Sequence, residues 1–166
     1  MNVTPKTLKA LIFDWGDTIM RDFPEKDGPM YLWDHVEWIP GAEEALKQLH
    51  NKFIMVIATN AGQSDTGGMK KALQRIGAEQ YFTYFFSSKD LTFEKPDVRF
   101  FQSIAEQIGV LPEKCAMIGN LYEKDIVGAR QCGMYTVLFD EKFTNMPFPM
   151  SDKVINSLMD LPEIFL

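Results

Sequence analysis

Short, almost continuous apolar runs alternate along this chain with segments of helical periodicity, and this alternation constrains the fold more than any other feature. A strand that is apolar on both faces must be covered on both faces, which is typical of parallel sheets. Apolar runs separated by amphipathic segments therefore predict a parallel sheet built from strand–helix–strand units. The predicted strands are residues 8–13, 53–58, 84–86, 115–118, 135–139 and 154–155.

Amphipathic helices are predicted between these strands. Apolar residues recur at helical spacing from Ala42 to Leu49, which places them on one face of a helix. Two further helical patterns end at Gly77 and Gly109, and glycine is common just past the end of a helix. Strands and helices together predict an α/β fold, a three-layer, Rossmann-like parallel sheet with helices on both faces. The remaining predicted helices span residues 126–132 and 158–165.

The length of 166 residues suits one well-buried core and is short for two, so residues 1–166 are predicted to form a single domain. Residues 19–39 interrupt the alternation, because they have no clean period yet carry Phe23, Trp33 and Trp38. A long irregular segment inside a compact domain is usually functional. The alternative is that its aromatic side chains form a small hydrophobic cluster beneath a loop.

Charge and composition exclude several classes of partner. The net charge of −6 gives no basic surface, so capture of nucleic acid or of an anionic membrane is not expected. A site for phosphate on such an acidic chain would need local positive charge from a metal, a lysine or a helix N-terminus. Cys115 and Cys132 have no metal-ligand spacing, and free thiols are expected. A polar N-terminal segment and short apolar runs make the cytoplasm the expected location.

Polar side chains follow the ends of predicted strands, except for Lys95, which precedes a predicted helix, and Asp125, which lies on the turn after a strand. Ligands of open parallel sheets bind beyond the carboxyl ends of the strands, so these side chains are candidates for a site. Each one also has an ordinary interpretation as a turn former, a helix cap or a solvated side chain. No single position decides between the two interpretations, but their common placement at one edge favours a site. In chain order they are Asp14, Thr59, Asn60, Lys95, Asn120 and Asp125.

The order of these residues resembles the haloacid dehalogenase superfamily, and the resemblance covers nearly the whole chain. The family's first motif is an apolar strand followed by Asp-x-Asp-x-Thr, and residues 11–18 here read Leu-Ile-Phe-Asp-Trp-Gly-Asp-Thr. The second motif is a strand that ends in Ser or Thr, here Thr59, and the third is a lysine, here Lys95-Pro96. The fourth is a strand followed by Gly-Asp and a second Asp, here Gly119-Asn120 and Asp125.

The resemblance implies a Mg²⁺-dependent phosphate monoester hydrolase that acts through an aspartyl phosphate on Asp14. Thr59 and Lys95 would assist catalysis, and Thr59, Asn60 and Lys95 would bind the phosphoryl group of the substrate. Oxygen ligands suit Mg²⁺, which shields the attack of one anion on another. The implied metal ligands are Asp14, the main-chain carbonyl of Gly16, Asn120 and Asp125.

The sequence departs from the family pattern at two positions. Gly16 stands where most phosphatases of the family carry an aspartate that serves as general acid and base, a function worth ~10²–10⁴-fold in rate. A modest rate is therefore expected, unless Asp17, one residue further on, replaces it. Asn120 stands where a second aspartate is usual, so metal affinity is expected to be lower.

Many relatives insert a cap domain, and the intervals in this chain are too short for one. The resemblance is therefore to capless members, with residues 19–39 as a flap over the site and a second subunit as a possible cover. The expected partner is a phosphorylated small molecule or macromolecule. The alternative function is a catalytically impaired domain that binds a phosphorylated ligand or partner protein. Carbon–halogen hydrolysis and phosphonate cleavage are disfavoured, because both usually draw on a cap.

Overall fold

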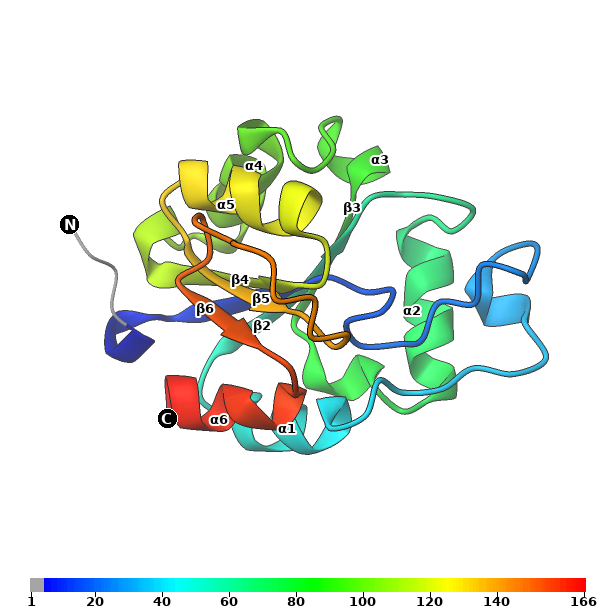
Figure 1. Ribbon diagram of the computed structural model, residues 1–166. Helices are drawn as coiled ribbons and strands as arrows, with labels where there is room; N and C mark the ends of the chain where they lie inside the picture. The colour runs from blue at the N-terminus through cyan, green and yellow to red at the C-terminus, as the bar shows by residue number, and fades with distance from the viewer. Residues whose placement is uncertain (1–4) are drawn as a thin grey trace.

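The computed structural model describes residues 5–166 (Figure 1). Residues 1–4, part of the N-terminal segment on which the expected location partly depends, lie outside the described residues. The strands form one sheet in the order β3-β2-β1-β4-β5-β6, and every neighbouring pair is parallel. The predicted parallel sheet is therefore confirmed. The strands are β1 (Ala10–Phe13), β2 (Ile54–Thr59), β3 (Tyr84–Ser87), β4 (Cys115–Gly119), β5 (Tyr135–Phe139) and β6 (Lys153–Ile155).

The strand order changes direction at β1. Phe13, the last residue of β1, is in register with Ile57 of β2 on one side and with Ile118 of β4 on the other. The chain first builds outward from β1 to β2 and β3, and then crosses over to begin β4 on the opposite side. Open parallel sheets bind ligands at such a reversal, beyond the carboxyl ends of the strands. Asp14 follows β1 at this point.

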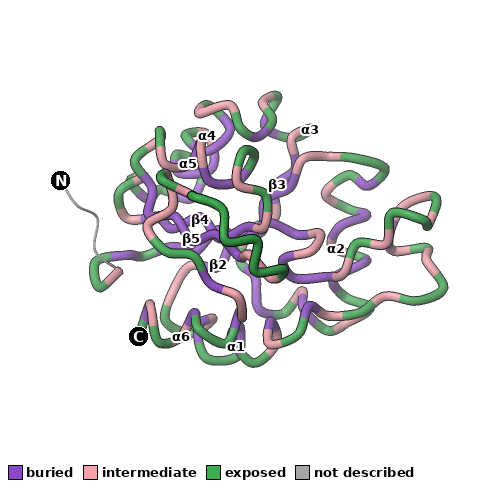
Figure 2. Tube along the Cα trace, viewed as in Figure 1, coloured by how far each residue is buried: buried purple, intermediate pink, exposed green. Residues whose placement is uncertain are grey.

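Helices cover both faces of the sheet, as predicted. Side chains alternate along β1, so Leu11 and Phe13 face one layer while Ala10 and Ile12 face the other. The first face is covered by α1, α2 and α6, and the second by α3, α4 and α5. Figure 2 shows the buried strands between these layers and the exposed connections around them. The helices are α1 (Ala42–Leu49), α2 (Thr66–Arg75), α3 (Ser88–Leu91), α4 (Val98–Ile108), α5 (Val127–Gln131) and α6 (Leu161–Phe165).

Some local structure departs from the sequence-based expectation. The short helix α3 was not predicted; a capping box between Ser87 and Asp90 fixes its first turn. The predicted last helix divides into a 3₁₀ turn and α6, with Pro162 in the first turn of α6. A π-helical turn, Tyr122–Ile126, precedes α5 and carries Asp125. Turns of this kind often occur at functional sites. The 3₁₀ turns are Pro5–Thr7, Met30–Leu32, Glu79–Tyr81, Pro112–Lys114 and Leu158–Asp160.

Residues 19–39 run beside the carboxyl end of β1. No cap domain is present in the described part of the chain. Met20 bridges to Gly16 and to Trp38, which ties both ends of the segment to the strand end. Met30 is buried in the core, and Trp33 and Trp38 pack against it. The inner side of this segment is therefore part of a hydrophobic cluster, which was the alternative interpretation of its aromatic residues.

Two further sequence-based expectations concern the cysteines and membranes. Cys115 and Cys132 are both free, and burial raises the pKa of Cys115 to about 12 and that of Cys132 to about 11. Such thiols are unreactive at neutral pH. Within residues 5–166, no helix combines the length and the apolar character needed to span a membrane.

Candidate active site

The predicted site residues meet at the carboxyl edge of the sheet. Asp14 follows β1, Thr59 ends β2, and Asn120 follows β4. Lys95 reaches this edge from the loop before α4, and Asp125 reaches it from the π-helical turn. The structure therefore brings together residues that lie far apart in the sequence.

A buried lysine joins the two aspartates. Lys95 Nζ lies 2.7 Å from Asp14 Oδ1 and 2.7 Å from Asp125 Oδ1, and it also donates to the carbonyl of Ala58 at 3.2 Å. The residues are almost completely enclosed, with exposed fractions of 4% for Lys95, 6% for Asp14 and 0% for Asp125. The interpretation of Lys95 as an ordinary solvated side chain is therefore excluded.

The charges in this cluster are unequal, because one ammonium faces two carboxylates. Burial lowers the pKa of Lys95, but the charges of Asp125 and Asp14 outweigh it and the net shift is upward. Burial raises the pKa of Asp125, and the charge of Asp14 raises it further. Like charges held close together disfavour each other's ionised form. The cluster therefore favours the binding of a further positive charge.

Asn60 holds the main chain of Lys95 in place. Its Oδ1 accepts from the Lys95 N–H at 2.8 Å, and its Nδ2 donates to the Lys95 carbonyl at 2.9 Å. Asn60 also lines the pocket described below, so its predicted part in binding the phosphoryl group stays a prediction beside this positioning role. Thr59, the residue before Asn60, donates from its hydroxyl to the Asn60 carbonyl at 3.2 Å. Its side chain faces the pocket described below.

Two glycines allow the surrounding segments to approach closely. A Cβ on Gly119 would lie 2.3 Å from Asp125 Oδ2, and a Cβ on Gly128 would lie 2.1 Å from the Pro96 carbonyl oxygen. Both distances are far shorter than van der Waals contact. The first glycine lets Asp125 fold back against β4, and the second lets α5 pack onto the loop that carries Lys95.

The oxygen atoms at this edge suit a hard divalent cation. Asp125 Oδ2 accepts from the Leu121 N–H at 2.9 Å, and the buried Thr18 hydroxyl donates to Asn120 Oδ1 at 3.3 Å. Such outer contacts orient ligands around a metal, and the role of Thr18 was not foreseen from the sequence. No group of three acidic, histidine or cysteine side chains suited to a metal occurs in residues 5–166. A metal here would therefore depend on two carboxylates, an amide and main-chain oxygen.

The carboxylates next to Gly16 have different surroundings. Asp17 has a positive φ of 55°, and its Oδ1 accepts from the Asp22 N–H at 3.0 Å and lies 3.5 Å from Arg21 Nη1. Asp22 is exposed overall, yet partial desolvation raises the pKa of its carboxyl, and the charge of Asp17 adds to the rise. Asp22 was not predicted from the sequence, because it belongs to no motif and lies in the irregular segment.

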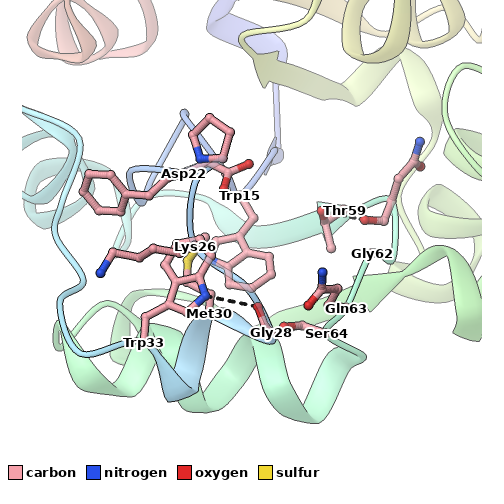
Figure 3. Close-up of a pocket in the computed structure, with 14 residues that line it drawn as sticks. Trp15, Asp22, Lys26, Gly28, Met30, Trp33, Thr59, Gly62, Gln63 and Ser64 are labelled. Atoms are coloured by element: carbon pink, nitrogen blue, oxygen red, sulfur yellow. Dashed lines mark hydrogen bonds between the residues drawn. The ribbon is translucent and has the colours of Figure 1, made fainter.

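A pocket opens beside Gly16 (Figure 3). One wall belongs to residues 22–33, which include Asp22, Lys26 and Trp33, and the opposite wall is formed by Thr59 at the end of β2 and by the loop that follows it, residues 60–64. The outer side of residues 19–39 therefore lines the site, in the place expected of a flap. The interpretation of this segment as a flap stays a prediction.

Comparison with known proteins identifies the family. The model of the haloacid dehalogenase-like hydrolases matches residues 16–133. The chain belongs to this family. The fold class of this haloacid dehalogenase-like hydrolase agrees with that assignment, and the sequence-based resemblance to the family is confirmed.

Relatives of this hydrolase include curated enzymes and a solved structure. A glyceraldehyde 3-phosphate phosphatase of Methanopyrus kandleri is 33% identical over 163 residues, which are 98% of this chain and 64% of that protein. A protein of the same name from Methanothermobacter thermautotrophicus is 32% identical over 98 residues, 55% of this chain and 43% of that protein. The chain thus spans between 43% and 64% of the length of these relatives. An uncharacterized protein from Listeria monocytogenes serotype 4b has a TM-score of 0.81 at 25% identity, covering 94% of this chain and 96% of the other.

Proposed function

We propose that this chain is a phosphate monoester hydrolase with Asp14 as its nucleophile. The observation that carries the proposal is the buried cluster in which Lys95 holds Asp14 and Asp125 at 2.7 Å each. An enclosed aspartate at the end of a strand, fixed by an ammonium ion and followed by the pocket-lining residues Trp15 and Gly16, is suited to covalent catalysis. Membership of the haloacid dehalogenase-like hydrolases supports the same reading.

The chemistry follows from the positions of these groups. Asp14 attacks the phosphorus of the bound ester, the bond to the leaving oxygen breaks, and an aspartyl phosphate forms. Water then attacks the phosphorus and releases inorganic phosphate, which restores the Asp14 carboxylate. Lys95 keeps Asp14 in one orientation and contributes positive charge next to the phosphoryl oxygens. The Thr59 hydroxyl lies at the pocket wall and would donate to one of them by turning away from the Asn60 carbonyl that it contacts in the structure.

The proposal includes a Mg²⁺ ion held by Asp14, Asp125, the Gly16 carbonyl and Asn120. The excess of carboxylate charge around Lys95 and the oxygen-only donor set support this choice. When bound, Mg²⁺ supplies electrostatic stabilisation of the charge on the transferring phosphoryl group. With two carboxylates and one neutral amide among the side-chain donors, the affinity is expected to be modest.

The pocket indicates where the leaving group of the substrate binds. It combines apolar side chains, Trp15, Met30 and Trp33, with Lys26 from the same wall. Lys26 pairs with Asp34 and lies 5.7 Å from the centre of the Phe23 ring. A phosphorylated molecule with a small or flat organic part fits such surroundings. The two relatives described above are named glyceraldehyde 3-phosphate phosphatases, which supports a phosphate ester without identifying it.

The alternative function is a domain that binds a phosphorylated ligand or partner without turnover. Gly16 favours it, because the usual general acid and base is absent from that position. The intact cluster of Asp14, Lys95 and Asp125 favours the hydrolase.

The direct test is a phosphatase assay with 4-nitrophenyl phosphate and a panel of alkyl phosphates. Each substrate is measured once with Mg²⁺ and once with EDTA in its place. We expect hydrolysis with Mg²⁺ and little with EDTA. Tight binding of phosphate or of a phosphorylated ligand with no release of phosphate under either condition would support the binding domain instead. Turnover that EDTA leaves unchanged would contradict the proposed role of Mg²⁺.

Replacing Asn120 with aspartate is expected to tighten Mg²⁺ binding. An aspartate adds a negative charge next to Asp14 and Asp125, and close charges at a protein surface interact by about 1–4 kcal/mol, so the dissociation constant should fall about tenfold. Isothermal titration calorimetry with Mg²⁺ measures the effect. Asn51→Asp, an exposed position remote from the site, is the matched control for net charge. Equal affinities of the Asn120→Asp variant and the wild type would remove Asn120 from the ligand set.

A further inference from the structure

Gly16 leaves a space beside the site, and the structure places another carboxylate next to that space. A Cβ built on Gly16 would lie 3.6 Å from Asp22 Cβ and 3.7 Å from Asp22 Oδ2. These are ordinary van der Waals distances. The Asp22 side chain therefore lies directly beside the volume that a side chain at position 16 would occupy. We propose that Asp22 is the general acid and base of the phosphoryl transfer, delivered from residues 19–39 instead of from the first motif. This proposal rests on the proposed phosphatase function.

The position of Asp22 relative to the pocket supports this role. Among the described residues, Asp22 is the only acidic side chain that lines the pocket beside Gly16. Figure 3 shows it on the wall formed by residues 19–39, across the opening from Thr59. A leaving group in this pocket would therefore lie between Asp22 and the residues that bind the phosphoryl group. A general acid must be within hydrogen-bond reach of the atom that it protonates.

Asp17, the other carboxylate near Gly16, has a different use. Its Oδ1 accepts the main-chain N–H of Asp22 and pairs with Arg21. Arg21 in turn donates to both carboxylate oxygens of Glu141, at 2.7 and 2.8 Å. These contacts hold the turn that presents Asp22, so Asp17 is a positioning residue. Asp22 lines both the pocket beside Gly16 and a second pocket on the side of Asn120, whereas Asp17 lines the second pocket and not the first.

Asp22 gives up one proton in the first step and takes one back in the second. In the first step Asp14 attacks phosphorus, the bond between phosphorus and the ester oxygen breaks, and the protonated Asp22 carboxyl gives its proton to that oxygen to yield the alcohol. In the second step Asp22 carboxylate takes a proton from the attacking water, the bond between phosphorus and Asp14 breaks, and inorganic phosphate leaves. Asp22 ends the cycle protonated, as it began. The sum is one ester and one water converted to one alcohol and one phosphate.

The test compares leaving groups, because only poor ones need a proton. Asp22→Asn keeps the size of the side chain and should lower kcat on an alkyl phosphate by ~10²-fold or more. The first burst of nitrophenolate from 4-nitrophenyl phosphate should change little, since nitrophenolate leaves without a proton. The second step does need a base, so the variant should accumulate aspartyl phosphate, detected by intact-protein mass after an acid quench. Asp27→Asn, an exposed position in the same segment, is the matched control.

A second variant keeps the result independent of folding defects. Gly16→Asp combined with Asp22→Ala moves the carboxylate to the position usual in the family, into the space that Asp22 vacates. We expect this double variant to regain at least about tenfold in kcat on the alkyl phosphate relative to Asp22→Ala alone. Circular-dichroism melts of all variants establish that the fold persists.

The outcomes separate this proposal from the proposed function. Turnover of alkyl phosphates by Asp22→Asn at the wild-type rate, with Asp14→Asn inactive, would overturn the role of Asp22 and leave the phosphatase intact. An equal loss on the alkyl ester and in the aryl burst would also overturn it, because that pattern indicates a structural defect. No hydrolysis of any ester by the wild type would overturn both.

Discussion

Asp14→Asn is expected to lower phosphatase turnover by at least ~10³-fold, because loss of the nucleophile removes the covalent route and such losses are large in other enzymes. The fold should persist. The asparagine oxygen can still accept from Lys95 Nζ, which lies 2.7 Å from Asp14 Oδ1 in the wild type. One of two carboxylates that share a single ammonium also becomes neutral. We therefore expect the variant to be as stable as the wild type or slightly more stable.

Phosphatase kinetics, a thermal melt and a trapping experiment check this result. Asp160→Asn, an exposed aspartate far from the site, should retain full activity and serves as the control. With Mg²⁺ and beryllium fluoride, the wild type should bind the phosphoryl mimic and be stabilised in the melt, whereas Asp14→Asn should not. Undiminished turnover by Asp14→Asn would require a different nucleophile and would remove the proposed function in its present form.

Lys95→Met should be the most destabilising substitution in the site. The ammonium faces Asp14 and Asp125, all three residues are at most 6% exposed, and methionine has a similar volume but no charge. Removing one partner from a buried ion pair typically costs about 3–5 kcal/mol, because the remaining charge is left without compensation. Here two carboxylates would lose their common partner. Denaturant unfolding should show this loss as a lower free energy of unfolding.

The same experiment tests whether charge causes the loss. Lys89→Met, an exposed lysine on α3, should change the free energy of unfolding by less than about 0.5 kcal/mol. Adding Mg²⁺ should restore part of the stability of Lys95→Met, because a cation between the two carboxylates compensates them. Combining Asp14→Asn with Lys95→Met should also restore part of it. A Lys95→Met protein as stable as the wild type would contradict the buried ion cluster.

The choice between hydrolase and binding domain depends on where the general acid and base comes from. In sequence, Gly16 removes it from the first motif. In space, Asp22 stands beside the same position. If Asp22 supplies the proton, the chain can hydrolyse phosphate esters although its first motif lacks the usual aspartate. Rates of hydrolysis of alkyl and aryl phosphates distinguish a hydrolase from a binding domain.

Much of the fold could be predicted from the sequence, because it depends on neighbouring residues. Apolar runs such as residues 115–118 determine buried strands, and the periodicity from Ala42 to Leu49 determines an amphipathic helix. The order of the strand-end residues placed Asp14, Thr59 and Asn120 at one edge, since parallel strands all end on the same side. The π-helical turn that carries Asp125 was missed, because its geometry has no periodic signal.

The alternation of apolar strands with amphipathic helices, together with the residues at the strand ends, was determined by the sequence alone, since each signal is local. Only the tertiary structure decided the buried contacts of Lys95, which join residues 81 and 30 positions away, the use of Asn60 to hold Lys95, and the position of Asp22 beside Gly16. Contacts of this kind depend on how segments distant in sequence pack together. No pattern of neighbouring residues predicts these contacts, because the free energy that stabilises them comes from the assembled core.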